Sequence, residues 1–326
     1  MTVSFVRMDI TMFFMAVVVV AIHTNPLANC SNQILLNIFD FISHCAVPFF
    51  FLRSGFFLGR KVNQTADTNN ALAVIKKYLF RICRLYLIWT IVYFPLAIYG
   101  FYIHHTPLLK SVLLYVRGFF LIGEQYNSWI LWYLLAMIYA LGMIYFLYKK
   151  AFSTTQIILI SVILFALGMG IDYIAHYSGA NHFICQLNGF SKALGLQGRF
   201  FSSALFISTG FFLSTKKIPW IISISAFFLG LFLFMLSVFP PICIFISSVA
   251  LFSLCTKGIN HKTNFFFIIR KASIAIYFIH LWIWTLCYLT IYGEKTFGPA
   301  IFAVTIFFTL IISLGHALHV TAPKKA

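Results

Sequence analysis

The chain has 326 residues, of which 62% are hydrophobic and only 9% are charged. A soluble domain is about half apolar and a quarter charged, so this composition excludes a water-soluble globular protein and makes lipid the solvent for most of the chain. The formal net charge is +17, yet no basic run exceeds two residues. This pattern favours lysines and arginines that orient a membrane protein and contact phospholipid over a nucleic-acid partner.

Apolar stretches of about 20 residues recur from end to end, and they predict an all-α integral membrane protein with about ten transmembrane helices. The predicted spans are 8–24, 36–59, 78–103, 128–148, 155–174, 199–214, 218–238, 241–256, 272–292 and 297–318. The segment 104–127 is apolar but carries Lys110, Arg117 and Glu124, so we expect an interfacial helix or a loop that does not cross.

The positive charges predict the orientation of these spans. If the N-terminus is cytoplasmic, 17 of the 23 lysines and arginines fall on the cytoplasmic side, five fall outside, and Arg53 lies within a span. Positive residues concentrate in cytoplasmic loops, so both termini are expected in the cytoplasm. No hydrophilic stretch is long enough for a separate domain, and residues 1–326 are expected to form one membrane-embedded domain.

The first predicted span contains polar residues at both of its ends. Arg7 and Asp9 lie at the cytoplasmic end, and His23 follows Arg7 by 16 residues, about 24 Å along a helix. Residues Thr24, Asn25 and Pro26 end the helix there. Two interpretations stay open: a titratable group in a water-filled cleft, suited to proton transfer, or a histidine in the lipid headgroup zone.

Two further basic features lie on the cytoplasmic side. Arg53 precedes Arg60 by seven residues, about 10 Å into the membrane, where it needs an anion, a group of carbonyls or a snorkelling path. Ser54-Gly55 beside it permits close approach of another backbone or a ligand. Arg81 and Arg84 are three residues apart on one helix face and can bind one polyanion together, although lipid headgroups would serve them equally well.

One span near the C-terminus carries a polar stripe. Ser273, Tyr277 and His280 are spaced by four and three residues, which places them on one side of a helix. Such a stripe usually forms hydrogen bonds with a neighbouring helix; lining a substrate channel is the alternative.

Taken in order, these pieces resemble the acyltransferase-3 family of integral membrane acyltransferases, and in particular the membrane module of vancomycin-resistance serine racemases. The matching pieces are Arg7-Met8-Asp9, Val19 to His23, Phe49 to Phe56, Arg81 to Arg84, Leu131 to Leu134, and Ser273 to His280. The soluble racemase half has no counterpart in the chain, so racemisation is not expected.

The resemblance implies transfer of an acyl group, usually acetyl, from cytosolic acyl-CoA to an extracytoplasmic hydroxyl such as that of a sugar or cell-surface glycan. It implies a multi-pass protein of the plasma membrane, expected to be the bacterial inner membrane. No bound cofactor and no metal are expected, and the partners are the lipid bilayer, acyl-CoA and the acceptor. The catalytic residues are expected to be His23 and Arg53, and the substrate-binding residues Arg7, Asp9, Ser54, Arg81, Arg84, Trp132, Arg199, Tyr277 and His280.

The chain departs from the family pattern at two places. The family has an arginine eleven residues before the histidine, where this chain has Met12, and a second arginine after an Asn-Gly appears only as Gln197-Gly198-Arg199. We therefore hypothesise that Arg53 supplies the missing cation from the second span. The missing arginine also favours an alternative, a non-enzymatic permease or flippase-like transporter of a small polar or amino-acid substrate, with the same polar residues along its path. A structural or assembly role is a third possibility.

Overall fold

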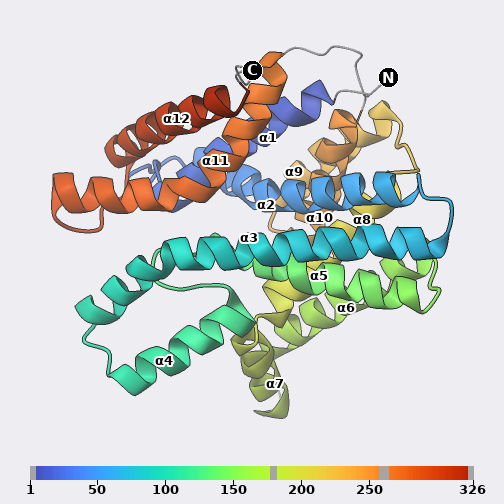
Figure 1. Ribbon diagram of the computed structural model, residues 1–326, viewed down its shortest axis with the longest axis horizontal. Coiled ribbons are helices and arrows are strands. Elements are labelled where there is room, and N and C mark those ends of the chain that lie inside the picture. The colour runs from blue at the N-terminus through green and yellow to red at the C-terminus, as the bar shows by residue number, and fades with distance from the viewer. Residues whose placement is uncertain (1–4, 177–181, 257–263, 322–326) are drawn as a thin grey trace, which may run out of the picture. The chain divides into compact units, whose positions relative to one another are not determined.

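The protein is described by a computed structural model that covers residues 5–176, 182–256 and 264–321, and these ranges contain helices and no strand (Figure 1). The α-helices are α1 (Val6–Thr24), α2 (Gln33–Val62), α3 (Thr68–Ile103), α4 (Leu108–Arg117), α5 (Leu131–Lys149), α6 (Thr154–Ala175), α7 (His182–Ala193), α8 (Ser202–Leu213), α9 (Trp220–Met235), α10 (Pro240–Cys255), α11 (Asn264–Cys287) and α12 (Pro299–Thr321). Three π-helical segments are η1 (Gly118–Ile122), η2 (Leu196–Phe201) and η3 (Tyr288–Tyr292).

Among the described residues, seven helices are long and apolar enough to cross a bilayer: α1, α2, α3, α5, α6, α11 with η3, and α12. The protein is therefore an all-α membrane protein. Each of the ten predicted spans overlaps a helix, and at seven of them the helix is long and apolar enough to cross a bilayer. The other three are the apolar helices Arg199–Leu213, Trp220–Met235 and Pro240–Cys255. Sixteen residues, as in α9 and α10, rise about 24 Å, less than the roughly 30 Å of a hydrocarbon core.

The break between α9 and α10 explains why these two helices are short. Ser237 and Phe239 have positive φ angles of 57° and 41°, which no helix interior tolerates. Prolines occupy the first positions of α10, where their missing N–H groups cost nothing. Segment α4 has ten residues and is likewise too short to cross, in line with the interfacial helix expected in 104–127.

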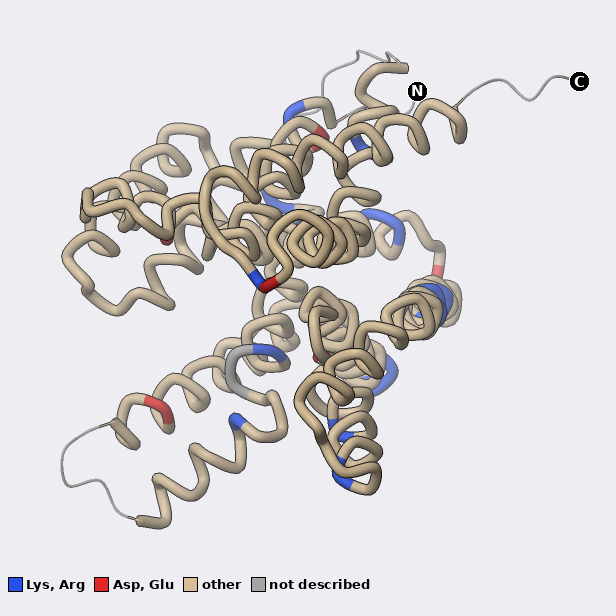
Figure 2. Tube along the Cα trace, turned by 90° about the vertical axis from the view of Figure 1, so that its left-hand side faces the viewer, with Lys and Arg blue, Asp and Glu red and all other residues tan. Residues whose placement is uncertain are grey.

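The chain divides into two compact units, and α2 contributes to both. Unit 1 comprises Met1–Phe50 and Ile218–Ala326, and unit 2 comprises Phe51–Lys217. Acidic positions are fewer than lysines and arginines along the chain (Figure 2).

In unit 1, α1 packs against α11 and α12 (Figure 1). Near the start of α1, Asp9 lies 4.0 Å from the guanidinium of Arg270 on α11. Near its end, the ring of His23 stacks on that of His280, also on α11. Because both contacts follow the same order along the two helices, α1 and α11 run parallel.

In unit 2, glycines let α2 and α8 approach backbone to backbone. A Cβ on Gly55 would collide with the carbonyl of Ile207, and one on Gly210 would collide with the carbonyl of Leu52. A Cβ on Gly59 would lie 2.6 Å from the carbonyl oxygen of Phe211. The expected close approach at Ser54-Gly55 is thus confirmed, and the spacing of Gly55 and Gly59 is the G-x-x-x-G pattern of membrane helix pairs.

Candidate active site

His23 lies at the C-terminal end of α1, where the helix is ended by its own sequence. Asn25 adopts a left-handed conformation with φ 43°, and its N–H bonds the carbonyl of Ala21. The Thr24 hydroxyl donates to the carbonyl of Val20 at 2.9 Å, so the last turn is well satisfied. The imidazole of His23 therefore lies in the last turn of the apolar helix and is partly exposed.

His280 is the neighbour of His23 from α11. The two ring centroids are 5.3 Å apart, with 28° between the ring planes. His280 is fully buried, and its Nδ1 bonds the carbonyl of Ile276 at 3.0 Å. Because a carbonyl only accepts, Nδ1 carries the hydrogen and Nε2 keeps a lone pair. That Nε2 has no hydrogen-bond partner in the described parts of the chain. A buried acceptor without a donor costs about 1–3 kcal/mol, so it is suited to a polar hydrogen of a substrate or water.

The remaining members of the α11 stripe have different contacts. The ring of Tyr277 lies 6.4 Å from that of His280 and meets Phe50 edge-on at 5.7 Å. Ser273 donates its hydroxyl hydrogen to the carbonyl of Ile269 in its own helix. Tyr277 therefore belongs to the surroundings of the histidine pair, whereas the hydroxyl of Ser273 is satisfied within α11.

A short loop, 293–298, covers the end of α1, and sequence reasoning missed it. The N–H of Gly298 bonds the carbonyl of Thr24 at 2.9 Å, next to His23. The ammonium of Lys295 lies 5.2 Å from the ring centroid of Trp284 and within electrostatic range of His23. Partial burial lowers the pKa of the Lys295 amine. The one sequence signal was a lysine between two glycines in a tight turn joining two spans.

Arg7 and Asp9 lie at the opposite end of α1. Asp9 is buried beside Arg270, and Arg7 is exposed on the first turn. Fourteen residues, about 21 Å of helix, separate Asp9 from His23.

In unit 2, Arg53 and Ser54 lie on α2 near the start of α5. The hydroxyls of Ser54 and Tyr133 are 3.3 Å apart, and Arg53 is within electrostatic range of the Tyr133 hydroxyl. The Arg53 guanidinium lies over the ring of Phe57, 5.0 Å from its centroid. The structure thus assembles a cation and two hydroxyls there. Met12 belongs to unit 1 and Arg53 to unit 2. The hypothesis that Arg53 replaces an arginine at Met12 therefore stays a prediction.

Arg81 and Arg84 are exposed on α3, on one face of the helix as their spacing indicates. The Arg81 guanidinium lies 4.6 Å from the ring centroid of Tyr78. Nothing acidic pairs with either arginine among the ion pairs of the described residues. Both are therefore placed to bind an anion from outside the protein.

Trp132 and Arg199, which the family resemblance suggested from two separate motifs, lie together. Arg199 forms an ion pair with Glu124 at 2.7 Å and donates to the carbonyl of Ile122. Its guanidinium is 5.9 Å from the ring centroid of Trp132. These contacts connect η2 to the end of η1, so Arg199 has a structural role whether or not it also binds substrate.

A double-mutant cycle measures that structural role. We expect Arg199→Gln to destabilise the protein by about 1–3 kcal/mol and Glu124→Gln by less, because the arginine also bonds Ile122. The coupling energy should be about 1 kcal/mol, since each side chain is less than one-third exposed. Thermal unfolding in detergent, followed by a dye that labels buried thiols, provides the measurement. Additive effects would contradict the pairing.

The helical bundle and the histidine pair define a class: a multi-pass membrane protein with a candidate acid–base centre at the end of its first long apolar helix. Residues 6–318 match the acyltransferase-3 family, described as an acyltransferase domain, and the chain belongs to that family. No group of three metal-binding side chains occurs among the residues that were placed.

Two curated relatives are both named amino-acid racemase and come from Enterococcus faecalis. One is 36% identical over 126 residues, 37% of this chain and 17% of the relative. The other is 30% identical over 215 residues, 64% of this chain and 28% of the relative. The chain thus spans less than a third of the length of these relatives. No solved structure gives a significant match.

Proposed function

We propose that the protein is a membrane-bound O-acyltransferase that moves an acyl group, in the first instance acetyl, from cytosolic acyl-CoA to an extracytoplasmic hydroxyl acceptor. The observation that carries this proposal is the stacked pair of His23 and His280 at the end of α1, in a chain that belongs to an acyltransferase family. A partly exposed imidazole can reach the proton of an acceptor hydroxyl, and the buried acceptor nitrogen beside it can orient a polar hydrogen there.

In the proposed reaction, His23 takes the proton of the acceptor hydroxyl while the hydroxyl oxygen attacks the thioester carbonyl. The tetrahedral intermediate collapses, the carbon–sulfur bond breaks, and the thiolate of CoA leaves and receives the proton that His23 took up. We assign binding of the donor phosphates to Arg81 and Arg84, and Arg53 to the donor as well, either at its thioester carbonyl or at its pyrophosphate. Tyr277 and Lys295 surround the histidine pair and are assigned to the acceptor.

The course of the helices supports chemistry that joins two sides of a membrane. Spans that run parallel are separated by an odd number of crossings. Four long helices, α2, α3, α5 and α6, lie between the parallel pair α1 and α11. An odd number of the three shorter apolar helices must then cross as well. The proposed ten spans with both termini cytoplasmic satisfy this condition, and His23 would then lie at the outer surface, at the other end of α1 from Arg7.

The proposal is tested by following radiolabelled acetyl-CoA with the purified protein in sealed vesicles. We expect label to leave CoA only when the thioester is supplied on the side of the membrane that carries Arg81 and Arg84. Transport of a polar solute with no consumption of acetyl-CoA would replace this proposal by the permease alternative.

The role of His280 can be separated from simple packing. We expect His280→Phe to keep the ring stack and the fold but to lower transfer by up to about 10²-fold, because the lone pair that orients a polar hydrogen beside His23 is lost. Initial rates at saturating acetyl-CoA, compared with the thermal midpoint of the same variant, check this. An unchanged rate would reduce His280 to a packing residue.

A further inference from the structure

We propose that the hollow between the α2–α3 loop and the first turns of α3 binds the phosphorylated nucleoside head of the thioester donor. A stripe of three cations on α3, Lys77, Arg81 and Arg84, would hold its phosphates. The inference depends on the proposed function only for the nature of the donor.

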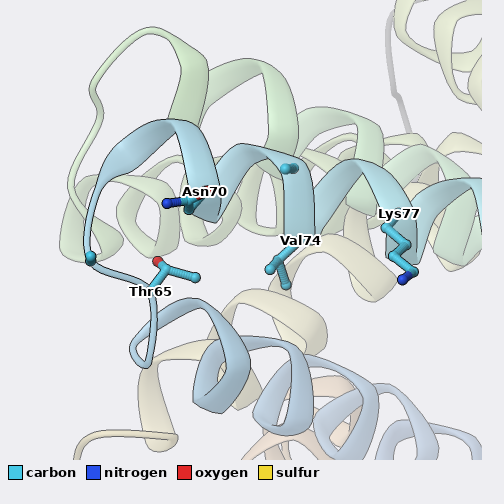
Figure 3. Close-up of a pocket in the computed structure, with 6 residues that line it drawn as sticks. Thr65, Asn70, Val74 and Lys77 are labelled. Atoms are coloured by element: carbon cyan, nitrogen blue, oxygen red, sulfur yellow. The ribbon is translucent and has the colours of Figure 1, made fainter.

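The hollow has a volume of about 390 Å³, inside the range of roughly 300–1,000 Å³ typical of small-molecule sites. Its lining combines apolar walls with a few polar groups: Thr65, Ala66, Asn70, Ala73, Val74 and Lys77. Figure 3 shows Val74 and Lys77 projecting from the same side of α3, with Thr65 on the loop and Asn70 at the start of the helix. A flat base fits against such small apolar side chains, and hydrogen bonds to the polar groups at the rim would fix its orientation.

The capping interaction at the start of α3 orients a polar side chain at the rim of the hollow. Asp67 caps α3 and accepts from the backbone N–H of Asn70 at 2.8 Å and from its side-chain Nδ2 at 2.7 Å. Because a carboxylate only accepts, the amide nitrogen of Asn70 must face Asp67. The amide oxygen of Asn70 is therefore held in one orientation at the pocket edge, where it can accept from the amino group of a base.

The charge continues along the helix beyond the pocket. Lys77, Arg81 and Arg84 are spaced by four and three residues, so they share one face and extend over about 10 Å of α3. No ion pair of the described residues involves these three side chains. A row of unneutralised cations leading out of an apolar hollow matches a ligand with a base at one end and several phosphates beyond it.

A lipid headgroup could also supply a phosphate to this row. The hollow favours the nucleotide, because a headgroup phosphate has no flat ring to fill the space beside Ala66, Ala73 and Val74. The experiment below distinguishes the two sources.

The test is binding of adenosine 3′,5′-bisphosphate to the full chain in phosphatidylcholine nanodiscs, measured by calorimetry. Lys77→Gln should weaken binding by about 10-fold through loss of a charge-assisted contact. Val74→Trp, which fills the hollow, should abolish nucleotide binding while pyrophosphate still binds to the arginines. The matched control is Lys76→Gln, which removes the same charge one residue away, outside the pocket lining and beside the ring of Phe80. We expect it to change binding less than twofold.

Equal weakening by Lys76→Gln and Lys77→Gln would overturn the proposal, because it would show unspecific attraction. Unchanged binding in Val74→Trp would overturn it too, as would displacement of the nucleotide by phosphatidylglycerol in the discs. If transfer proceeds with the wild-type KM for acetyl-CoA in both pocket variants, the pocket assignment is wrong and the proposed function stands. If the nucleotide binds as expected but no acyl transfer occurs, the proposed function is wrong and the pocket stands.

Discussion

His23→Gln is expected to lower the rate of acetyl transfer by about 10²–10⁴-fold, the contribution of a positioned general base. Glutamine keeps a polar side chain of similar reach at the end of α1 but cannot take up a proton at neutral pH. The loss should appear in kcat rather than in the KM for acetyl-CoA, since the donor phosphates are assigned to α3. Steady-state release of labelled CoA in sealed vesicles measures both.

His44→Gln is the matched control for this substitution. His44 lies in the same unit and is exposed on α2, where it contacts Asp40 of its own helix at 3.2 Å and lies 6.3 Å from the ring centroid of Phe234 on α9. We expect its transfer rate to stay within twofold of the wild type. Equal rates in the His23 and His44 variants would remove the proposed general base.

Gly210→Ala is expected to have the largest effect on stability. Its Cβ would meet the backbone carbonyl of Leu52, which no rotation of a side chain can move, so α2 and α8 must separate. Overpacking of this kind costs about 1–3 kcal/mol, occasionally more. The thermal midpoint in detergent should fall by several degrees, as reported by labelling of the buried thiols of unit 1 and by intrinsic fluorescence.

Gly142→Ala makes the same change in the same unit, on α5, where a Cβ meets nothing within 4 Å. It should leave the thermal midpoint unchanged or raise it, because alanine favours a helix by up to about 1 kcal/mol over glycine. Combining Gly210→Ala with Gly55→Ala should cost less than the sum of the two, since one separation of the helices relieves both collisions. A harmless Gly210→Ala would show that the two backbones are not in contact.

The sequence predicted some groupings of the candidate site residues and missed others. The difference depends on how far apart in the chain the interacting residues lie. The spacing of Arg81 and Arg84, and of Tyr277 and His280, is a property of one helix, so sequence alone placed each pair on one face. The stacking of His23 on His280 joins residues 257 positions apart, and no local pattern contains it. Lys295 was missed for the same reason, because it approaches His23 only after loop 293–298 folds over the end of α1.

Residues such as Arg199 show the opposite case. The family resemblance made it a candidate substrate-binding residue, and the structure gives it Glu124, the Ile122 carbonyl and the ring of Trp132 as partners. No local pattern pairs Arg199 with Glu124, because the two residues lie 75 positions apart in the chain.

The sequence by itself determined that this is a membrane protein of long apolar helices, with His23 ending the first of them, because burying hydrocarbon and satisfying backbone hydrogen bonds depend on composition and local order. Only the tertiary structure decided which polar groups meet. The parallel course of α1 and α11, the glycine contact of α2 with α8 and the hollow at the start of α3 depend on packing between segments far apart in the chain. Packing depends on the shapes of both segments, and the sequence of one segment does not specify which segment packs against it.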